Sequence, residues 1–264
     1  MNSDTGIDRR SFVVAVALTA LASAVPRIAA SATASATVSR ARSTVLVFDV
    51  ADTLLNLDAL TPLFARVFGD GNVANVWFGE SILYAETMTV TRSFTPFGKI
   101  GEGVFRMLGK IRGVTVTLAD VEELVERFGE LPAHADVAEG LDDLRRGGFR
   151  MVTLTNTPAN GYALARAGID KYFERHFSAE TVKQFKPSAE TYQMVATQLG
   201  LSTSELCMVA AHPWDLIGAQ TAGCSTALLA RRGVAQLKVP GLRAPLAGSN
   251  LVDVARQLSA ESST

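Results

Sequence analysis

Four short segments of the chain carry polar side chains suited to chemistry. They include the carboxylates of Asp49 and Asp215, the ammonium of Lys186, and the hydroxyl and amide groups of Thr155 and Asn156. The segments are residues 49–54, 155–157, 186–187 and 210–215. A carboxylate that is partly desolvated and held near a lysine stays ionised and attacks an electrophilic carbon or phosphorus atom. These residue types therefore suit nucleophilic catalysis by a carboxylate, provided that the fold brings the segments together.

The elements around these segments predict an α/β fold that does so. Residues 44–48 form a short, almost continuously apolar run that ends at Asp49, as in a strand buried on both faces of a parallel sheet. From residue 133 onward, strand and helix patterns alternate, separated by glycines. Further strands are predicted at 149–155, 205–211 and 225–229, with helices at 137–146, 158–167, 188–199, 213–222 and 251–258. This alternation predicts a Rossmann-like, doubly wound parallel sheet, in which loops at the carboxyl ends of the strands share one site.

Residues 58–132 follow a different pattern. Their apolar side chains recur at helical spacing, and no convincing strand pattern lies among them. We therefore predict a helical cap subdomain inserted after the first strand. The core domain would consist of residues 43–57 and 133–260.

The first 36 residues are typical of an export signal. The Arg9–Arg10 pair precedes an apolar run over residues 13–25, and alanines and serines follow. This pattern resembles a twin-arginine signal peptide with a small-residue linker. The apolar run is short and rich in alanine, so a stable membrane span in the mature form is not expected. We expect a periplasmic or secreted protein.

Composition narrows the remaining classes of function. The chain has 264 residues, and its 25 basic side chains nearly balance its 26 acidic ones. Nothing in this balance indicates a nucleic-acid surface. The only cysteines, Cys207 and Cys224, are too few for a disulfide framework, and no Cys/His spacing resembles a zinc site. Whether these two cysteines pair stays open at this stage.

In order and spacing, the four segments resemble the four motifs of the haloacid dehalogenase superfamily. The motifs read FDVADTL from residue 48, LTN from 154, FKP from 185 and VAAHPWD from 209. The Trp214–Asp215 pair, the Thr191–Tyr192 pair and the insert after the first strand are similar to those of the type II 2-haloacid dehalogenases. The resemblance covers about residues 45–258. It implies a metal-independent hydrolase without a cofactor that acts on a small 2-haloacid, and it makes a homodimer formed through the insert an expectation.

The resemblance also implies a role for each catalytic residue. Asp49 would displace halide from carbon and form an ester, which water then hydrolyses. Lys186 would stabilise the charge of Asp49 and lower its pKa. Thr155 and Asn156 would hold a substrate oxygen or the halide. Asp215 would orient or deprotonate the water.

Three further residues are expected around the nucleophile and the substrate. His212 stands where the dehalogenases commonly carry asparagine, and it would contact Asp49, position water or play a structural part. Thr53 would hydrogen-bond the Asp49 loop. Trp214 would pack beside the substrate, although packing alone is the more common role of such a residue.

Two positions depart from the dehalogenase pattern. Ala51 replaces an aromatic residue, and Phe78 replaces an arginine that follows a tryptophan and binds halide or the substrate carboxylate. A phenyl ring cannot neutralise a carboxylate. One interpretation is that Arg92 or Lys99 supplies the missing charge. Another is a less charged or bulkier substrate in an apolar pocket lined by Phe78, Tyr84 and Phe94.

Two other classes of function stay open. A phosphatase or phosphonatase of the same superfamily would use Mg²⁺. Ala51 removes the general acid that a phosphatase needs, and Ala211 stands where the first of two metal-binding acids is expected. A non-catalytic binding protein on the same fold would have kept the scaffold and lost the chemistry. The retained Asp49 and Lys186 argue against this reading.

Overall fold

The strands predicted from the sequence lie in one parallel sheet. The computed structural model describes residues 44–159, 161–240, 242–243 and 245–261, so the predicted export signal lies outside the described residues. The sheet has six strands in the order β3-β2-β1-β4-β5-β6, and every neighbouring pair is parallel. The strands are β1 (Val45–Phe48), β2 (Arg150–Thr155), β3 (Arg175–Ser178), β4 (Leu206–Ala210), β5 (Ser225–Leu229) and β6 (Leu246–Gly248). The predicted Rossmann-like architecture is confirmed.

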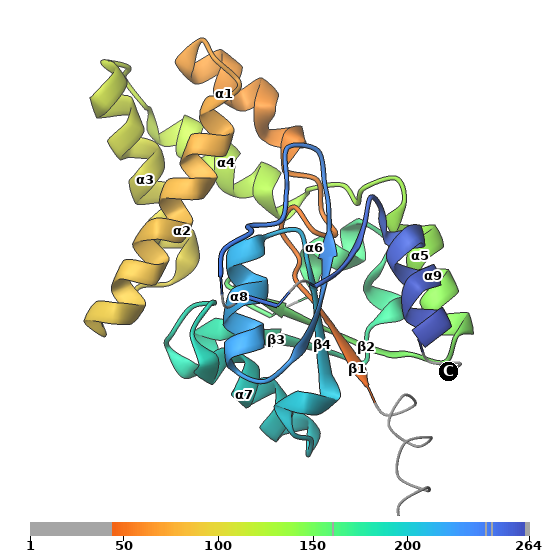
Figure 1. The fold of residues 1–264 in the computed structure, drawn as a ribbon. Helices are drawn as coiled ribbons and strands as arrows, with labels where there is room; N and C mark the ends of the chain where they lie inside the picture. Colours follow the sequence, from red (N-terminus) through yellow and green to blue (C-terminus); the bar gives the residue numbers. More distant parts are fainter. Residues whose placement is uncertain (1–43, 160, 241, 244, 262–264) are drawn as a thin grey trace, which may run out of the picture. The chain divides into compact units, whose positions relative to one another are not determined.

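The central strand β1 is buried on both faces, as its apolar run predicts. Val45 and Val47 belong to one hydrophobic cluster, and Leu46 and Phe48 belong to the other. This division follows from the period of two in a strand, which points successive side chains to opposite faces. Helices α5 (Val137–Arg146) and α9 (Leu251–Glu261) pack side by side on one face (Figure 1). Helices α7 (Ala189–Leu199) and α8 (Pro213–Thr221) cover the other face.

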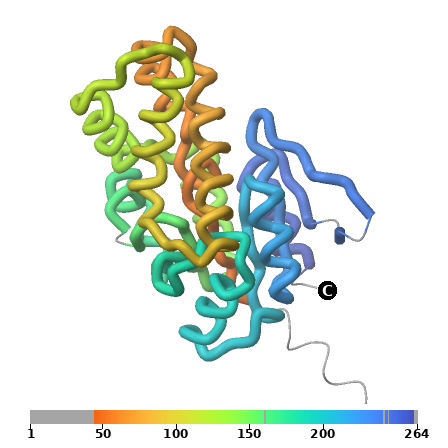
Figure 2. Tube along the Cα trace, turned by 90° about the vertical axis from the view of Figure 1, so that its left-hand side faces the viewer, coloured from red at the N-terminus to blue at the C-terminus, as the bar shows by residue number. Residues whose placement is uncertain are grey.

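The inserted segment is helical. A 3-10 helix over Leu57–Leu60 leads into α1 (Thr61–Phe68), α2 (Val73–Thr91), α3 (Phe97–Arg112) and α4 (Leu118–Gly129). Figure 2 shows these helices together, in orange to yellow-green. They pack on one another through aromatic rings such as Phe64, which lies 5.6 Å from Trp77 and 5.3 Å from Phe105 between ring centroids. Even the longest helices of the described part of the chain lack the length and apolar character needed to cross a membrane.

The helical insert is attached to the core by hydrogen bonds as well as by packing. The backbone N–H of Phe97, at the start of α3, donates to Glu180 of the core at 3.1 Å. In the opposite direction, the N–H of Phe185 in the core donates to the hydroxyl of Thr89 in α2 at 2.9 Å. The ring of Phe94 stacks on Phe185 with centroids 5.5 Å apart. These contacts join the insert to the segment of the core that follows β3.

Two strands and one helix differ from the sequence-based expectation. The outermost strands, β3 and β6, are short, and only part of each is buried, so their sequences lack a continuous apolar pattern. The helix predicted at 158–167 is much shorter, because α6 spans only Tyr162–Arg166. It begins after Gly161, whose φ of +64° is the left-handed conformation that interrupts a right-handed helix.

Candidate active site

The carboxyl ends of three neighbouring strands gather the predicted site residues. β1 lies between β2 and β4, and the three run parallel. Asp49 follows β1, Thr155 ends β2, and the loop after β4 leads to Asp215 in the first turn of α8. Lys186 reaches the same place from the loop before α7. The four segments therefore meet as the sheet topology predicts.

Lys186 connects the two predicted carboxylates. Its Nζ donates to Oδ1 of Asp49 at 2.7 Å, to Oδ2 of Asp215 at 2.7 Å and to the carbonyl oxygen of Leu154 at 3.1 Å. An ammonium group has three protons, so these three acceptors use all of them. Lys186 is 1% exposed, whereas the nearby Lys183 is exposed to solvent. The lysine that reaches the site is therefore Lys186 of the predicted FKP motif and not Lys183.

These contacts shift the pKa values of all three groups. Burial tends to raise the pKa of Asp49, but the charges of Lys186 and His212, together with hydrogen bonds, bring it below its ordinary value of 3.8. Burial tends to lower the pKa of Lys186, but the carboxylates of Asp215 and Asp49 raise it above 10.5. Burial and the charge of Asp49 raise the pKa of Asp215, although Lys186 opposes this shift. The result is a buried carboxylate, Asp49, that stays ionised.

Thr53 holds the other oxygen of Asp49, as predicted for the first motif. Its hydroxyl donates to Oδ2 of Asp49 at 2.5 Å and accepts a hydrogen bond from the backbone N–H of Ala211 at 2.8 Å. Both carboxylate oxygens of Asp49 are therefore hydrogen-bonded, and the carboxylate is fixed relative to the loop after β4. Asp52 has a φ of +61°, and its carbonyl oxygen lies 3.1 Å from Nε2 of His134.

Arg231 supports this loop, and no sequence pattern indicated it. Its Nε and Nη2 both donate to the carbonyl oxygen of Thr53, at 3.2 and 2.8 Å, and its Nη1 donates to Asp136 at 2.6 Å. Asp136 in turn accepts from the backbone N–H of Leu251 at the start of α9. The buried guanidinium thereby links the nucleophile loop to two helices of the core. Because Arg231 lies in a loop far along the chain, only the folded structure shows this contact.

Asn156 offers a hydrogen-bond donor that the described residues leave unused. Its Oδ1 accepts from the backbone N–H of Lys186 at 3.0 Å, which identifies the other side-chain atom as the amide nitrogen. This Nδ2 is buried and has no partner among the described residues. The neighbouring Thr155 hydroxyl is 2.9 Å from the hydroxyl of Thr157 and accepts from its N–H. Buried donors are rarely left unpaired, so Nδ2 is suited to a substrate atom or a leaving group.

Asp215 is held on both sides. Besides its bond to Lys186, its Oδ1 accepts a 2.6 Å hydrogen bond from the hydroxyl of Tyr192 in α7, which also contacts the carbonyl oxygen of Asp215 at 2.9 Å. Asp215 is 0% exposed. Tyr192 was noted in the sequence only as part of a motif, and its support of Asp215 was not predicted. Since both oxygens are occupied, Asp215 reaches the nucleophile through Lys186.

His212 lies between two aromatic rings beside the nucleophile. Its ring stacks on Trp214, with centroids 5.4 Å apart, and packs against Phe78 at 5.3 Å. Its Nε2 is 3.1 Å from the carbonyl oxygen of Ala51, which can only accept, so this nitrogen carries a proton. The same atom is 3.8 Å from Oδ2 of Asp49. The residue that replaces the expected arginine, Phe78, thus lies within this aromatic stack.

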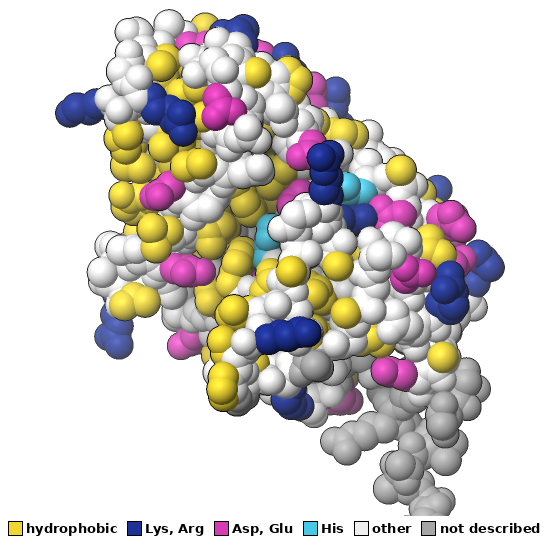
Figure 3. Space-filling model, turned by 45° about the horizontal axis from the view of Figure 1, so that its top comes forward, with side chains coloured by type: hydrophobic (Ala, Val, Ile, Leu, Met, Phe, Trp, Pro, Cys, Tyr) yellow, Lys and Arg dark blue, Asp and Glu magenta, His cyan; other side chains and the backbone are white. Residues whose placement is uncertain are grey.

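A small chamber and a larger cavity adjoin Asp49. The chamber, about 20 Å³, is lined from the cap and the core by, among others, Asp49, Phe78, Asn156, Lys186, His212 and Trp214. The cavity, about 290 Å³, is lined mainly by apolar side chains of the cap. In Figure 3, hydrophobic side chains gather on the part of the surface where the cap meets the core. The expectation that Tyr84 and Phe94 line an apolar pocket is wrong, because neither lines the chamber or the cavity.

The two cations proposed to replace the missing arginine do not reach the site. Lys99 is paired with Glu102, and its side chain is 66% exposed. Arg92 ends α2 in a left-handed conformation and lines neither the chamber nor the cavity. In the described ranges of the chain, no group of three or more histidine, cysteine, aspartate or glutamate side chains is arranged to hold a metal ion.

Comparison with known proteins places the chain in a family. A family model described as haloacid dehalogenase-like hydrolase matches residues 44–223, more than half of the chain. The chain belongs to the haloacid dehalogenase-like hydrolases. The resemblance read from the four motifs is therefore confirmed, and the match includes Asp49, Thr53, Asn156, Lys186 and Asp215 within its range.

Individual relatives of this hydrolase include dehalogenases and a phosphatase. It is 26% identical to (S)-2-haloacid dehalogenase 4A from Burkholderia cepacia over 191 residues, which cover 71% of this chain and 83% of that protein. The fold is similar to that of L-2-haloacid dehalogenase from Xanthobacter autotrophicus with covalently bound chloropropionic acid. The TM-score is 0.73 at 21% identity, covering 81% of this chain and 98% of the other. Phosphoglycolate phosphatase from Vibrio parahaemolyticus is 25% identical over 48% of this chain and 63% of its own.

Proposed function

We propose that this hydrolase breaks carbon–halide bonds through an ester formed on Asp49. The observation that carries the proposal is the state of the Asp49 carboxylate, which is buried, held by Lys186 and Thr53, and next to a chamber. A carboxylate with a lowered pKa and little water around it is an effective nucleophile. The dehalogenase relatives support the choice of a carbon–halide bond as the target.

In the first step, an oxygen of Asp49 attacks the carbon that bears the halogen. A carbon–oxygen bond forms as the carbon–halogen bond breaks, and the halide leaves with the bonding electron pair. The unpartnered Nδ2–H group of Asn156 is the donor in the chamber that can stabilise this developing charge. The fixed position of the carboxylate lowers the entropy cost of reaching the attack geometry.

In the second step, water attacks the carboxyl carbon of the ester. The bond between this carbon and the alcohol oxygen breaks, the alcohol leaves with a proton, and Asp49 is regenerated. The net reaction converts an organohalide and water into an alcohol, a halide ion and a proton. Because Asp215 is enclosed by Lys186 and Tyr192, we assign it the role of holding Lys186 beside the ester. We place the attacking water on the side of Asp49 where His212 lies.

The second candidate, a Mg²⁺-dependent phosphatase, fits the residues less well. Mg²⁺ needs near-octahedral oxygen ligands, usually including one or two carboxylates. Here the ammonium of Lys186 lies between Asp49 and Asp215, at 2.7 Å from each, and the carbonyl oxygen of Ala51 already accepts from His212. Position 51 also lacks the carboxyl group of a general acid. The donor set therefore does not fit a magnesium site.

The proposal is tested by measuring halide and phosphate release from matched substrates. The chain is incubated with both enantiomers of 2-chloropropionate, with haloacetates and with p-nitrophenyl phosphate, each with Mg²⁺ and with EDTA. Halide release that persists in EDTA is expected. The Asp49→Asn variant should release none, and Asp52→Asn, altered at a neighbouring carboxyl that lies 3.9 Å from Nε2 of His134, should retain activity.

Two outcomes would contradict the proposal. Phosphate release that requires Mg²⁺ would assign the site to phosphate chemistry. No turnover of any halide by a folded protein, with Asp49→Asn behaving like the unaltered chain, would favour a binding protein that has kept only the fold.

A further inference from the structure

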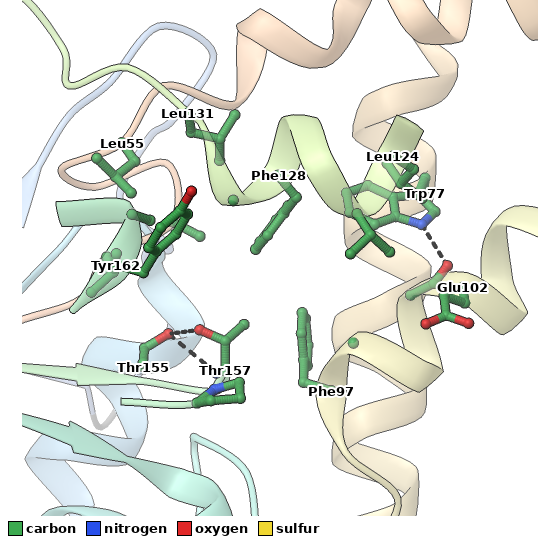
Figure 4. A pocket seen from close by; sticks show the side chains of 18 residues that line it. Leu55, Trp77, Phe97, Glu102, Leu124, Phe128, Leu131, Thr155, Thr157 and Tyr162 are labelled. Atoms are coloured by element: carbon green, nitrogen blue, oxygen red, sulfur yellow. Dashed lines mark hydrogen bonds between the residues drawn. The ribbon is translucent and has the colours of Figure 1, made fainter. Parts of the chain in front are cut away.

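The cavity beside Asp49 is large and apolar. Its volume is about 290 Å³, and its apolar lining includes Leu55, Trp77, Phe97, Leu124, Phe128 and Leu131. Figure 4 shows the rings of Phe97 and Phe128 facing each other across this space. An engineered cavity of roughly 150 Å³ with apolar walls accommodates benzene. The cavity here therefore has room for an apolar group well beyond the methyl group of a chloropropionate.

The cavity adjoins the chamber at the nucleophile. Ala51, Phe97, Phe128, Thr155 and Thr157 line both spaces. Ala51 is two positions after Asp49 and carries only a methyl group where the dehalogenases usually have an aromatic ring. A substrate whose reacting carbon lies at Asp49 can thus extend past Ala51 into the cavity.

The polar groups of the cavity wall are largely satisfied by one another. The hydroxyls of Thr155 and Thr157 lie 2.9 Å apart, and the indole N–H of Trp77 donates to the carbonyl oxygen of Gly101 at 2.8 Å (Figure 4). The one carboxylate in the lining, Glu102, is paired with Lys99. Burial of a polar substituent without a partner is unfavourable, so this wall favours a hydrocarbon.

The chamber at Asp49 offers no unpaired lysine or arginine of the described residues to a carboxylate substrate. Among the described residues that line the chamber and the cavity, Lys186 is the only lysine or arginine, and all three of its protons are already donated. When Asp49 and Asp215 are both ionised and His212 is neutral, the two carboxylates outweigh the charge of Lys186. A substrate carboxylate would lose its hydration and meet an excess of negative charge.

We propose that the substrate is an uncharged organohalide with a bulky apolar group, a medium-length alkyl chain or a bicyclic ring, which occupies the cavity. This inference rests on the proposed function, because it assumes that Asp49 attacks a carbon–halogen bond. It replaces the small 2-haloacid with a neutral, apolar substrate. The reacting carbon lies at Asp49, and the apolar group lies between Phe97 and Phe128.

The test compares four bromides that differ only in charge and in chain length. They are 2-bromopropionate, 2-bromopropionamide, 2-bromooctanoate and 2-bromooctanamide, and bromide release gives kcat/KM for each. We expect 2-bromooctanamide to be turned over at least tenfold faster than either acid. Transfer of a methylene group from water to an apolar site predicts up to roughly fourfold in kcat/KM for each carbon that the cavity accepts.

Two variants test whether the cavity is responsible. Ala51→Phe adds a ring at a residue that lines both the chamber and the cavity. Gly98→Leu adds a side chain to a cavity-lining position where a new Cβ meets open space, and Gly103→Leu makes the same change elsewhere on α3, outside the lining. We expect the ratio of kcat/KM for the long amide to that for the short amide to fall at least tenfold in the first two variants. In Gly103→Leu this ratio should not change.

Binding without catalysis gives a second readout. Octan-1-ol and propan-1-ol are titrated into the Asp49→Asn variant while tryptophan fluorescence is followed, because Trp77 lines the cavity. Octan-1-ol should bind far more tightly and should lose its advantage when Gly98→Leu is added.

The outcomes separate the inference from the proposed function. Bromide release that is fastest from 2-bromopropionate, with no gain from chain length, overturns the inference and leaves the hydrolase proposal intact. An unchanged chain-length ratio in both cavity variants also overturns it. Absence of bromide release from all four compounds, together with none from the haloacids, overturns the proposed function itself.

Discussion

The nucleophile is defined at the scale of single residues. Asp49 could be singled out in the sequence because a carboxylate directly after a buried strand lies at the ligand-binding edge of a parallel sheet. Its partners Lys186, Thr53 and Asn156 were predicted from motifs in the same way, and the structure places them within hydrogen-bonding distance of Asp49 or beside it. Tyr192 was missed as a site residue, because a tyrosine in a helix indicates packing unless its hydroxyl has a known partner.

The lowered pKa of Asp49 predicts how the reaction depends on pH. A carboxyl group whose pKa is lower in the folded than in the unfolded protein stabilises the fold at pH values above its unfolded-state pKa. This stabilisation is lost as the pH falls through the folded-state pKa. Asp49, with a pKa below 3.8, should therefore stay ionised throughout the range from about pH 5 to about pH 8. We expect that kcat/KM for halide release does not fall through protonation of Asp49 anywhere in this range. An acidic limb with an apparent pKa above about 5 that is traced to Asp49 would contradict this expectation.

Tyr192→Phe tests the support of Asp215. The change removes one hydroxyl and leaves two buried acceptor atoms of Asp215 without that donor. We expect the free energy of unfolding to fall by about 1–3 kcal/mol. Tyr84→Phe is the matched control, because that hydroxyl is near the surface and donates to the sulfur of Met107 at 3.6 Å. Chemical denaturation of both variants decides the matter, and equal stabilities would show that the hydroxyl of Tyr192 contributes nothing specific.

At the scale of elements, burial decided which strands were predictable. β1, β2, β4 and β5 are almost wholly buried, so their apolar runs are continuous. β3 and β6 are the outer strands, and their sequences mix exposed and buried positions. The order of strands in the sheet cannot be read from such local patterns, because it depends on pairing between segments far apart in the chain.

Arg231 connects elements that the sequence does not associate with the nucleophile. Arg231→Ala removes the guanidinium group that donates to the carbonyl oxygen of Thr53 and to Asp136. We expect the free energy of unfolding to fall by about 1.5–3 kcal/mol, since the lost hydrogen bonds come from a buried charged group. The exposed Arg256, which pairs with Asp253 one helical turn away, is the control, and its replacement by alanine should cost less than about 1 kcal/mol. Thermal and urea unfolding measure both, and a smaller loss for Arg231 than for Arg256 would refute the role assigned to this contact.

At the scale of the whole molecule, the cap determines what the sequence could not show. Helical spacing predicted that residues 58–132 are helical, but not which side chains face the core. The structure shows that Phe97 and Phe128 line the cavity, whereas the sequence suggested Tyr84 and Phe94. Its lining combines residues of the cap helices with the loops after β1 and β2, so it exists only in the assembled fold.

The two cysteines report on the integrity of the whole fold. Both are buried free thiols. Burial raises the pKa of Cys207 to about 11 and that of Cys224 to about 12, so little thiolate is present near neutral pH. We expect iodoacetamide to modify neither in the folded protein and both once urea unfolds it. Mass spectrometry of the alkylated chain checks this, and rapid modification before unfolding would contradict the burial of both thiols.

The central claim is that Asp49 forms an ester that water cleaves at the carboxyl carbon. Turnover of a halide substrate in water enriched with oxygen-18, followed by mass spectrometry of the peptide that contains Asp49, tests it most directly. The account predicts that oxygen-18 enters the carboxylate of Asp49, and that under single-turnover conditions the alcohol product keeps an unlabelled oxygen from this side chain. Direct incorporation of oxygen-18 into the first-turnover alcohol, with Asp49 unlabelled, would show that water attacks the substrate itself and would contradict the account.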